Sequence, residues 1–457
     1  MALTSAIAFG DLLDYRFDAE CYRPDLQAVE ARVATKDTRA LETVASVSDG
    51  NHISIANSFS SAGVRYLKGA ELSDVFIDDS EPTYIPRSIY DQITRAHVQR
   101  GDVLLSVIGT VGPVAFVDGR FDLLSCSCKL AILRPHSISG ALLAAYLLSP
   151  TGQALLLRRN RGSVQQGVVL PDVRAFPVPP FGERLTEMVE GIMKEAAREK
   201  KRADSLYPSA EQEMLERMGW EQLRDRPVEL TYTTKLVDLD NEARSDAEFF
   251  QPRYARFRAK LAKSGAQLAE LVSRFDKGTQ PSGYSEKGDV VVVKSKQVTG
   301  RGIDLTGCER TSSDAWTDEG ARLSSGDLVI NSTGRGTLGR AAVVPEHREK
   351  MVAAVDLVVA RLHARAINAD YLALFLNSPA GLMQSDQFQT GSSGQLHLYP
   401  QHFAKFIVFL PRTKDGKTID FAWQDSLAER VKAAQKAKES CRVKLEEAKN
   451  LVELSLR

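Results

Sequence analysis

The sequence contains a long internal repeat, in which segments of the first half recur in the second half in the same order. Residues 18–26 read DAECYRPDL and residues 246–254 read DAEFFQPRY, an offset of 228 residues (246 − 18). A further match at a similar offset joins GDVLLSVIGTVGPVAFV at 101–117 to GDLVINSTGRGTLGRAAVV at 326–344. Each copy is large enough to hold its own core, so two similar domains are expected rather than a solenoid of short repeats.

The matched segments predict the same elements in both copies. Each Gly-Asp pair opens an apolar strand, a glycine-containing bend and a second strand, and the bend of the second copy is longer by two residues. Apolar strands at 129–135 and 356–362 come next, followed by short apolar helices that end at Ser149 and Ser378. Each copy closes with an apolar, proline-containing strand. The fold class is therefore expected to be α+β, with two tandem β-rich domains.

A different periodicity follows each copy. Apolar residues spaced by threes, fours and sevens run from Leu185 to Leu206 and again from Leu427 to Leu456, with charged residues around them. Narrow stripes of this kind are typical of helices that pair along a seam. We expect these two long helices to pair as an antiparallel coiled coil that separates the two domains. Pro208 is expected to end or kink the first helix near Leu206.

Charge and composition limit the class of protein. Lys plus Arg and Asp plus Glu both number 59, so the chain lacks the basic excess of a free-standing nucleic-acid binder. The longest apolar run, 141–148, is far shorter than a membrane span, and the first residues do not resemble a secretory signal. The five cysteines have no zinc-site spacing. These features predict a cytoplasmic protein with no membrane contact, reduced thiols and no metal.

The wording of the repeat resembles a known family. The Asp-Ala-Glu starts, the Gly-Thr-x-Gly bends at 109–112 and 336–339, the Gly-Ser segments, the closing proline strands and LYPSAEQEML at 206–215 are similar to specificity (S) subunits of type I restriction–modification systems. The resemblance covers nearly the whole chain. The departures are Asn331 in place of Ser106 and the longer second bend.

This resemblance implies a non-catalytic reader of a split, asymmetric site in double-stranded DNA. It implies target-recognition domains at 1–181 and 221–412, each followed by a conserved-region helix, at 182–220 and 413–457. The helices would set the distance between half-sites and dock two modification (methyltransferase) subunits, which bind S-adenosylmethionine and methylate adenine. An ATP-dependent, translocating restriction subunit can join such complexes. This chain itself is expected to bind no cofactor.

The residues do not point to chemistry within this chain. The sequence has no Gly-x-x-x-x-Gly-Lys-Ser/Thr phosphate loop. The segment at 178–181, Val-Pro-Pro-Phe, lacks the Asn or Asp that an adenine methyltransferase motif needs. The seven histidines are scattered without a metal-binding pattern. A self-contained nuclease or methyltransferase is therefore the least favoured reading, and a protein–protein scaffold that keeps the duplicated architecture is the main alternative to a DNA reader.

Reading DNA requires hydrogen-bond donors on exposed loops, with amides and guanidinium groups for base edges and cations or hydroxyls for phosphates. The segment 158–166 carries three arginines and three amides, whereas its counterpart at 387–395 is rich in amides and hydroxyls. In the second copy the basic residues lie elsewhere, near 294–301 and 335–340. The predicted DNA-binding residues are Lys68, Arg158, Arg159, Arg161, Ser163, Gln165, Gln166, Lys294, Lys296, Gln297, Arg301, Arg335, Arg340, Gln387, Gln389, Ser392 and Gln395.

Overall fold

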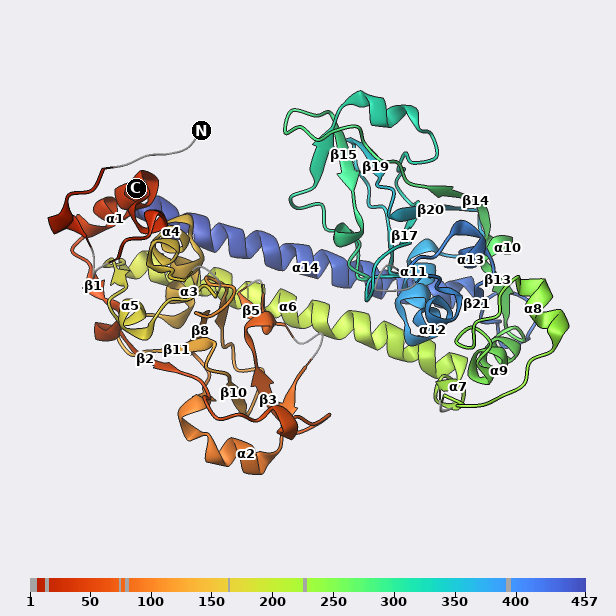
Figure 1. Cartoon of the computed structure of the whole chain (residues 1–457), viewed down its shortest axis with the longest axis horizontal. Coiled ribbons are helices and arrows are strands. Elements are labelled where there is room, and N and C mark those ends of the chain that lie inside the picture. The colour runs from red at the N-terminus through yellow and green to blue at the C-terminus, as the bar shows by residue number, and fades with distance from the viewer. Residues whose placement is uncertain are drawn as a thin grey trace. The chain divides into compact units, whose positions relative to one another are not determined.

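The structure is a computed structural model, and it describes residues 6–12, 16–73, 75–78, 82–162, 165–224, 228–391 and 396–457. The chain divides into two compact units. Unit 1 contains Met1–Lys201 and Lys438–Arg457, and unit 2 contains Arg202–Ala437. Unit 1 is therefore built from both ends of the chain. Figure 1 shows the elements in chain order, and the units are described separately below.

The first copy of the repeat folds around a four-stranded antiparallel sheet in the order β2-β11-β8-β9. A second sheet, β6-β3-β10-β7, contains the parallel pair β3 and β10. The short strands β1 and β12 pair with each other. The helices and strands are α1 (Pro24–Ala34), β1 (Arg39–Ala40), β2 (Ala45–Asp49), β3 (Val64–Leu67), β4 (Leu72–Ser73), β5 (Phe76–Ile77), β6 (Tyr84–Ile85), α2 (Arg87–Gln92), β7 (His97–Val98), β8 (Val103–Ser106), β9 (Val114–Phe116), β10 (Leu124–Cys126), β11 (Leu130–Pro135), α3 (Gly140–Leu148), α4 (Pro150–Arg159), α5 (Leu170–Arg174) and β12 (Pro177–Val178).

The second copy repeats the order of the main sheet, whereas its second sheet has three strands where that of the first copy has four. Its main sheet has the order β14-β20-β17-β18, and its second sheet, β16-β15-β19, contains the parallel pair β15 and β19. The strands β13 and β21 pair as β1 and β12 do. The elements are α8 (Leu236–Glu242), α9 (Pro252–Leu261), β13 (Gly265–Gln267), α10 (Leu268–Leu271), β14 (Val272–Lys277), β15 (Val290–Val293), β16 (Glu309–Thr311), β17 (Leu328–Asn331), β18 (Ala341–Val343), β19 (Lys350–Ala353), β20 (Leu357–Leu362), α11 (Ala369–Asn377), α12 (Pro379–Phe388), α13 (Pro400–Ala404) and β21 (Ile407–Phe409). The expected α+β fold with two similar domains is confirmed.

A Ser-Pro-x-Gly turn joins the two buried helices of each copy. Ser149 ends α3 and caps α4, because its Oγ accepts a hydrogen bond of 3.1 Å from the Gly152 N–H. A side chain at Gly152 would lie 2.0 Å from the Tyr146 carbonyl oxygen, and one at Gly381 would lie 2.2 Å from that of Leu376. The repeated glycines are therefore needed for close packing of the second helix on the first. This explains why LLSPTGQ at 147–153 recurs as LNSPAGL at 376–382.

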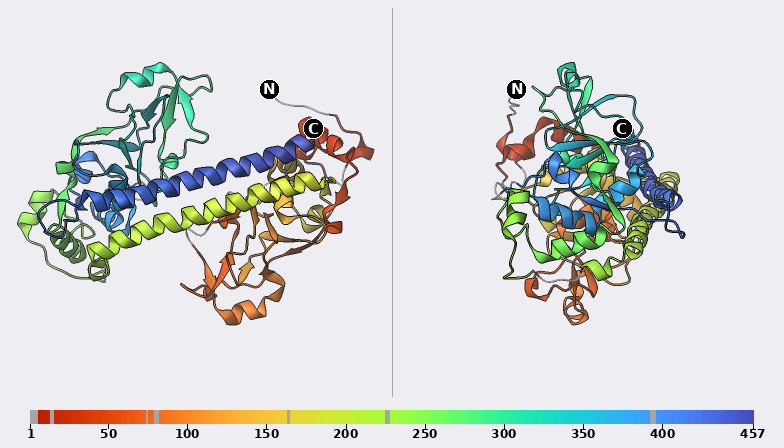
Figure 2. Two further views of the ribbon diagram at one scale, coloured as in Figure 1. Left: turned by 180° about the vertical axis from the view of Figure 1, so that it is seen from behind. Right: turned by 90° about the vertical axis from the view of Figure 1, so that its right-hand side faces the viewer.

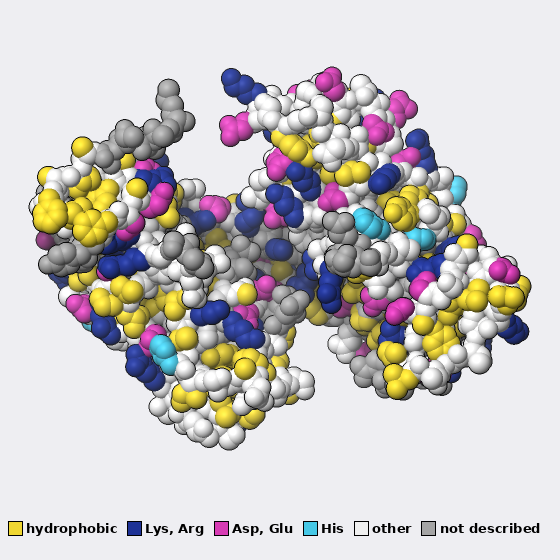
Figure 3. All heavy atoms as spheres, viewed as in Figure 1, with side chains coloured by type: hydrophobic (Ala, Val, Ile, Leu, Met, Phe, Trp, Pro, Cys, Tyr) yellow, Lys and Arg dark blue, Asp and Glu magenta, His cyan; other side chains and the backbone are white. Residues whose placement is uncertain are grey.

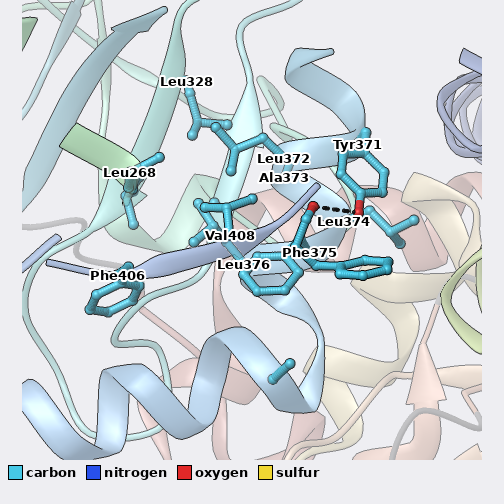
Figure 4. Packing of buried hydrophobic residues seen from close by; sticks show 14 of the residues in the cluster. Leu268, Leu328, Tyr371, Leu372, Ala373, Leu374, Phe375, Leu376, Phe406 and Val408 are labelled. Carbon is cyan, nitrogen blue, oxygen red and sulfur yellow. Dashed lines mark hydrogen bonds between the residues drawn. The ribbon is translucent and has the colours of Figure 1, made fainter. Parts of the chain in front are cut away.

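The cores of the two copies lie between the main sheet and this helix pair. In unit 2, Leu328 of β17 and Val408 of β21 pack with apolar residues of α11, including Leu372 (Figure 4). The buried Tyr371 Oη donates a hydrogen bond of 2.8 Å to the Phe409 carbonyl, so its polar atom is satisfied. Unit 1 has the equivalent core, built on α3 and β8. Among the described residues, no single helix has the length and apolar content of a membrane span; the bent pair of α3 and α4, at 72°, reaches them jointly.

The long helices α6 (Glu183–Met218) and α14 (Phe421–Ser455) pair with each other inside each unit, and Figure 2 shows them from two further sides. In unit 2, Glu213 forms an ion pair with Arg430 and Arg217 forms one of 2.8 Å with Asp420. From the first pair to the second, the residue number rises in α6 and falls in α14, so the two helices are antiparallel, as expected. The buried seam consists of Val189, Met193, Ala196, Tyr207, Ala210 and Met214 from α6 and Leu427, Val431, Ala434, Cys441, Leu445, Ala448, Val452 and Leu456 from α14.

The expectation that Pro208 ends or kinks the first helix near Leu206 is wrong about the ending, because α6 continues through Pro208 to Met218. Proline removes one backbone hydrogen bond from a helix, which costs about 3 kcal/mol in an isolated helix. Here Pro208 is exposed, whereas its neighbours Tyr207 and Ala210 are buried in the seam. Packing on the buried face therefore carries the helix past a proline that faces solvent.

Candidate nucleic-acid interface

In the first copy, loops from distant parts of the chain meet at one edge of the paired sheets. The Asn51 N–H donates to the Cys126 carbonyl at 2.8 Å, and the Cys128 N–H donates back to the Asn51 carbonyl at 3.0 Å. The Ser127 N–H donates to the Leu67 carbonyl at 2.9 Å, at the end of β3. The segments that follow β2, β3 and β10 are therefore held side by side by backbone hydrogen bonds.

The bend after β8 joins the Gly-Ser segment. The Gly109 N–H donates to the Gln166 carbonyl at 2.9 Å, and the Val168 N–H donates to the Val107 carbonyl at 2.9 Å. The repeated glycine bend and the residues 166–168, which lie far apart in sequence, are thus neighbours.

The second copy builds the same edge from the equivalent loops. The Thr279 N–H donates to the Ala353 carbonyl at 2.9 Å, as Asn51 does in the first copy. The Gly334 N–H donates to the Leu396 carbonyl at 3.1 Å, and the Leu398 N–H donates to the Ser332 carbonyl at 2.8 Å. We call the two sets of loops the loop edges; they comprise 50–53, 68–71, 107–112, 126–129, 161–162 and 165–167 in the first copy and 278–281, 294–297, 332–339, 354–356, 390–391 and 396–397 in the second.

A lysine stands at the same place in both loop edges. Lys68 follows β3 with its Nζ 4.4 Å from the centre of the Phe59 ring, and Lys294 follows β15 with its Nζ 4.0 Å from that of Tyr284. Burial alone would lower the pKa of Lys294, but hydrogen bonds to Glu309 and Tyr284 raise it. Both lysines therefore present a cation beside a partly exposed aromatic ring.

The arginines of the segment 158–166 differ in their surroundings. Arg158 and Arg159 both form ion pairs with Glu30 of α1, and burial lowers the pKa of both guanidinium groups. These contacts favour a structural role in joining α4 to α1. Arg161 forms a two-point pair with Asp172 at 2.9 and 3.0 Å, and its side chain is half-buried.

Other predicted residues are placed as follows. Gln165 and Gln166 are exposed on the first loop edge. Lys296, Arg301 and Arg335 are exposed in the second copy, with the Arg301 guanidinium 5.4 Å from the centre of the Tyr207 ring. Three residues of the prediction lie outside the described part of the chain: Ser163, Ser392 and Gln395.

The remaining predicted residues of the second copy are less exposed. Gln297 is buried and its Oε1 accepts from the Lys294 N–H at 3.2 Å, while Gln387 is buried and its Nε2 donates to the Phe249 carbonyl at 3.3 Å. Both amides therefore have a structural role, because they make hydrogen bonds to the backbone of the protein itself. Arg340 and Gln389 are half-buried.

Sequence reasoning missed a repeated arginine that supports the loop edges. The Arg16 guanidinium forms a two-point pair with Asp18 and donates to the carbonyls of Arg158 and Asn160 at 2.8 and 2.6 Å. Arg244 forms the same pair with Asp246 and donates to the carbonyls at the end of α12. The signal was present in the sequence, because an arginine stands two residues before both repeated Asp-Ala-Glu starts.

The pairing of these arginines with Asp18 and Asp246 predicts that the stability of the fold depends on pH. The hydrogen bond from Arg16 lowers the pKa of Asp18 below its ordinary value of 3.8, and the pKa of Asp246 is also lowered, because Arg244 outweighs the effect of burial. A lowered folded-state pKa gives stability that is present above pH 4 and is lost as pH falls further. The double variant Asp18→Asn, Asp246→Asn should be less stable at pH 7 by about 0.5–1 kcal/mol per site, with a smaller difference below pH 4. Urea unfolding at pH 7 and pH 3 measures this, and an equal difference at both would contradict it.

The surface charge is mixed. On the face shown in Figure 3, Lys and Arg side chains are interspersed with Asp and Glu side chains over both units. Within the described residues, no group of three or more His, Cys, Asp or Glu side chains could hold a metal ion. What the described parts of the loop edges offer is hydrogen-bond donors and exposed cations such as Lys296 and Arg335 on loops that are held by backbone hydrogen bonds.

No protein-family model and no curated protein matches the sequence. The fold is similar to that of several solved structures. The S subunit of a type I restriction–modification system from M. genitalium is 12% identical, with a TM-score of 0.45 over 92% of this chain and 94% of that one. The HsdS subunit from Thermoanaerobacter tengcongensis is 15% identical, with a TM-score of 0.28 over 92% and 96%. A chain from a structure describing complex assembly and conformational transition of the type I R-M system is 15% identical, with a TM-score of 0.30 over 92% and 97%.

Proposed function

We propose that this chain is the DNA-specificity subunit of a cytoplasmic type I restriction–modification complex. The observation that carries the proposal is that two copies of one fold present equivalent loop edges with different side chains. The two edges carry equivalent lysines, Lys68 in the first copy and Lys294 in the second. They differ elsewhere, because Gln165 and Gln166 are exposed on the first edge and Arg335 is exposed on the second. One framework with two sets of donors suits a target with two related but unequal halves.

In this proposal residues 1–181 and 221–412 each read one half of a split site in double-stranded DNA, and the helices at 182–220 and 413–457 dock two methyltransferase subunits. Support for docking comes from the outer face of α14. Val443 and Leu454 are exposed there, on an open face of the helix that also carries Leu451 and charged residues. An apolar stripe with charged flanks fits a helix of a partner protein.

The catalytic group, the S-adenosylmethionine and any ATP-driven step are assigned to the partners. The net charge of this chain is zero, so it contributes little non-specific attraction to phosphates. We therefore expect the methyltransferase subunits to supply much of the affinity, and this chain to supply the selectivity.

The experiment is a genome-wide map of methylated adenines in cells with and without this chain. The expected result is the loss of one split motif when the chain is absent. Two double variants test the two halves separately. The variant Gln165→Ala with Gln166→Ala should relax or abolish recognition of the half read by the first copy. The variant Lys296→Ala with Arg335→Ala should do the same for the half read by the second copy. The matched control is Lys263→Ala, an exposed cation of unit 2 outside the loop edges, which should leave the motif unchanged. An unaltered methylation map without the chain would instead favour a protein–protein scaffold.

A further inference from the structure

A buried carboxylate holds two exposed donors at the first loop edge. Asp49 is the last residue of β2, and its side chain is 12% exposed. Its Oδ2 lies 2.5 Å from His52 Nε2, and its Oδ1 accepts a hydrogen bond from Arg95. The side chains of His52 and Arg95 are 62% and 65% exposed. The two donors are thus fixed at one end and open to solvent at the other.

The backbone around this group is held by hydrogen bonds of the two sheets. Asp49 pairs with Ala131 in the main sheet, and His97, two residues after Arg95, pairs with Ser125 of β10. His52 follows Asn51, which is bonded on both sides to the turn after β10. The group therefore belongs to the same loop edge as Lys68, and its geometry is set by the sheets.

The second copy lacks this group. Lys277 pairs with Val358 where Asp49 pairs with Ala131, so the register places Lys277 at the position of Asp49. Arg322 bridges to Val352 where His97 pairs with Ser125, which places Gly320 at the position of Arg95. One copy carries a carboxylate and an arginine, and the other carries neither at those positions. The group is therefore a difference between the copies and not a requirement of their shared fold.

The chemistry favours a base edge over a phosphate. The Asp49 carboxylate offsets the charge of Arg95 and would repel an approaching phosphate, which weakens any purely electrostatic contact. The guanidinium keeps further N–H donors, and its orientation is fixed before binding, so less side-chain entropy is lost. Paired N–H donors of arginine match the N7 and O6 acceptors of guanine in the major groove.

We propose that Arg95 and His52 read one guanine-containing base pair in the half-site of the first copy, with Asp49 as their positioning residue. This inference rests on the proposed function and adds to it the base class and the half-site. Removing Arg95 should then relax one position of the motif and leave the other half-site as it was.

The test uses the complex with its methyltransferase subunits and duplexes that carry the mapped motif or one substituted base pair. Arg95→Ala should lower discrimination at one guanine position by about ten- to hundredfold, the range expected for one two-point arginine contact. Asp49→Asn and His52→Gln should relax the same position by smaller factors, with unchanged melting temperatures showing that the fold is intact. The matched control is Arg87→Ala, because the Arg87 side chain is 64% exposed and pairs with Asp91. It should leave discrimination at every position unchanged.

Two outcomes would overturn the inference while the proposed function stands. One is that the wild-type chain recognises a split motif and the Arg95→Ala variant discriminates at every position of that motif as well as the wild type does. The other is an equal loss of affinity for every sequence, with a shallower salt dependence, which is the signature of a phosphate contact. Absence of any split motif with the wild-type chain would overturn the proposed function, and this inference with it.

Discussion

Substitution of Gly278 by alanine is expected to destabilise unit 2 by about 3 kcal/mol. A Cβ atom at this position would lie 2.0 Å from the Ala354 carbonyl oxygen and 2.7 Å from that of Ala353. Both obstacles are backbone atoms at the end of β19, which is paired along its length with β15, so they cannot move aside cheaply. The first copy has the same close approach at Gly50, where a Cβ would lie 2.3 Å from the Ser127 carbonyl oxygen.

Tryptophan fluorescence isolates this effect, because Trp220, Trp316 and Trp423 all belong to unit 2. Urea unfolding followed by fluorescence should show a lower midpoint for Gly278→Ala. The matched control is Gly283→Ala, whose added Cβ would meet no atom within 4 Å and which should change stability by less than about 1 kcal/mol. Equal midpoints for the two variants would show that the close approach is not a constraint.

Replacement of Glu453 by alanine is expected to destabilise unit 1 by about 3 kcal/mol. Glu453 lies near the end of α14 and is 8% exposed. Its carboxylate accepts hydrogen bonds from the Thr151 N–H at 2.9 Å and from the Thr151 Oγ1 at 3.0 Å, and Arg32 lies 3.7 Å away. Thr151 stands in the first turn of α4, where a negative charge is favoured. Removal of the carboxylate leaves a buried N–H without its acceptor.

Hydrogen exchange should show faster exchange in α4 and in the last turns of α14 of this variant. The fluorescence transition of unit 2 should be unchanged, which gives an internal control. Glu447→Ala removes an exposed carboxylate from the same helix and should leave exchange in α4 unaltered. Destabilisation of both units to the same extent would contradict the assignment of Glu453 to unit 1.

The duplicated architecture could be predicted from the sequence because its constraints are local and occur twice. The Gly-Asp turns, the Ser-Pro-x-Gly helix junctions and the seam of α14 each depend on residues within a few positions of one another. All eight apolar positions expected to form the seam from Leu427 to Leu456 are buried. On α6 the stripe shifts by one position, because Met193 and Tyr207 are buried and the expected Ile192 and Leu206 are half-buried, and Met214 extends the seam past its expected end at Leu206. A straight helix has 3.6 residues per turn, so a strict seven-residue repeat drifts around it by about 20° per heptad and the buried face passes to the neighbouring position.

The candidate site was harder to predict, because a side chain's partner decides whether it is available. Arg158 and Arg159 look like their exposed neighbours in sequence, yet both pair with Glu30, more than a hundred residues away. Asp49, His52 and Arg95 looked unremarkable because no spacing rule joins position 95 to position 49. At Pro208 the expectation was wrong for a similar reason. The tendency of proline to end a helix is local, whereas the burial of the neighbouring seam residues, which continues the helix, depends on α14.

The composition of unit 1 sets the order in which the chain can mature. Residues 438–457 contribute Cys441, Leu445, Ala448, Val452 and Leu456 to the core of the copy that leaves the ribosome first. Domains generally fold as they emerge during synthesis, but this one lacks part of its core until residues 438–457 have also been made. A stop codon at position 438 would therefore expose the apolar core of the N-terminal copy and leave unit 2, which ends at Ala437, complete.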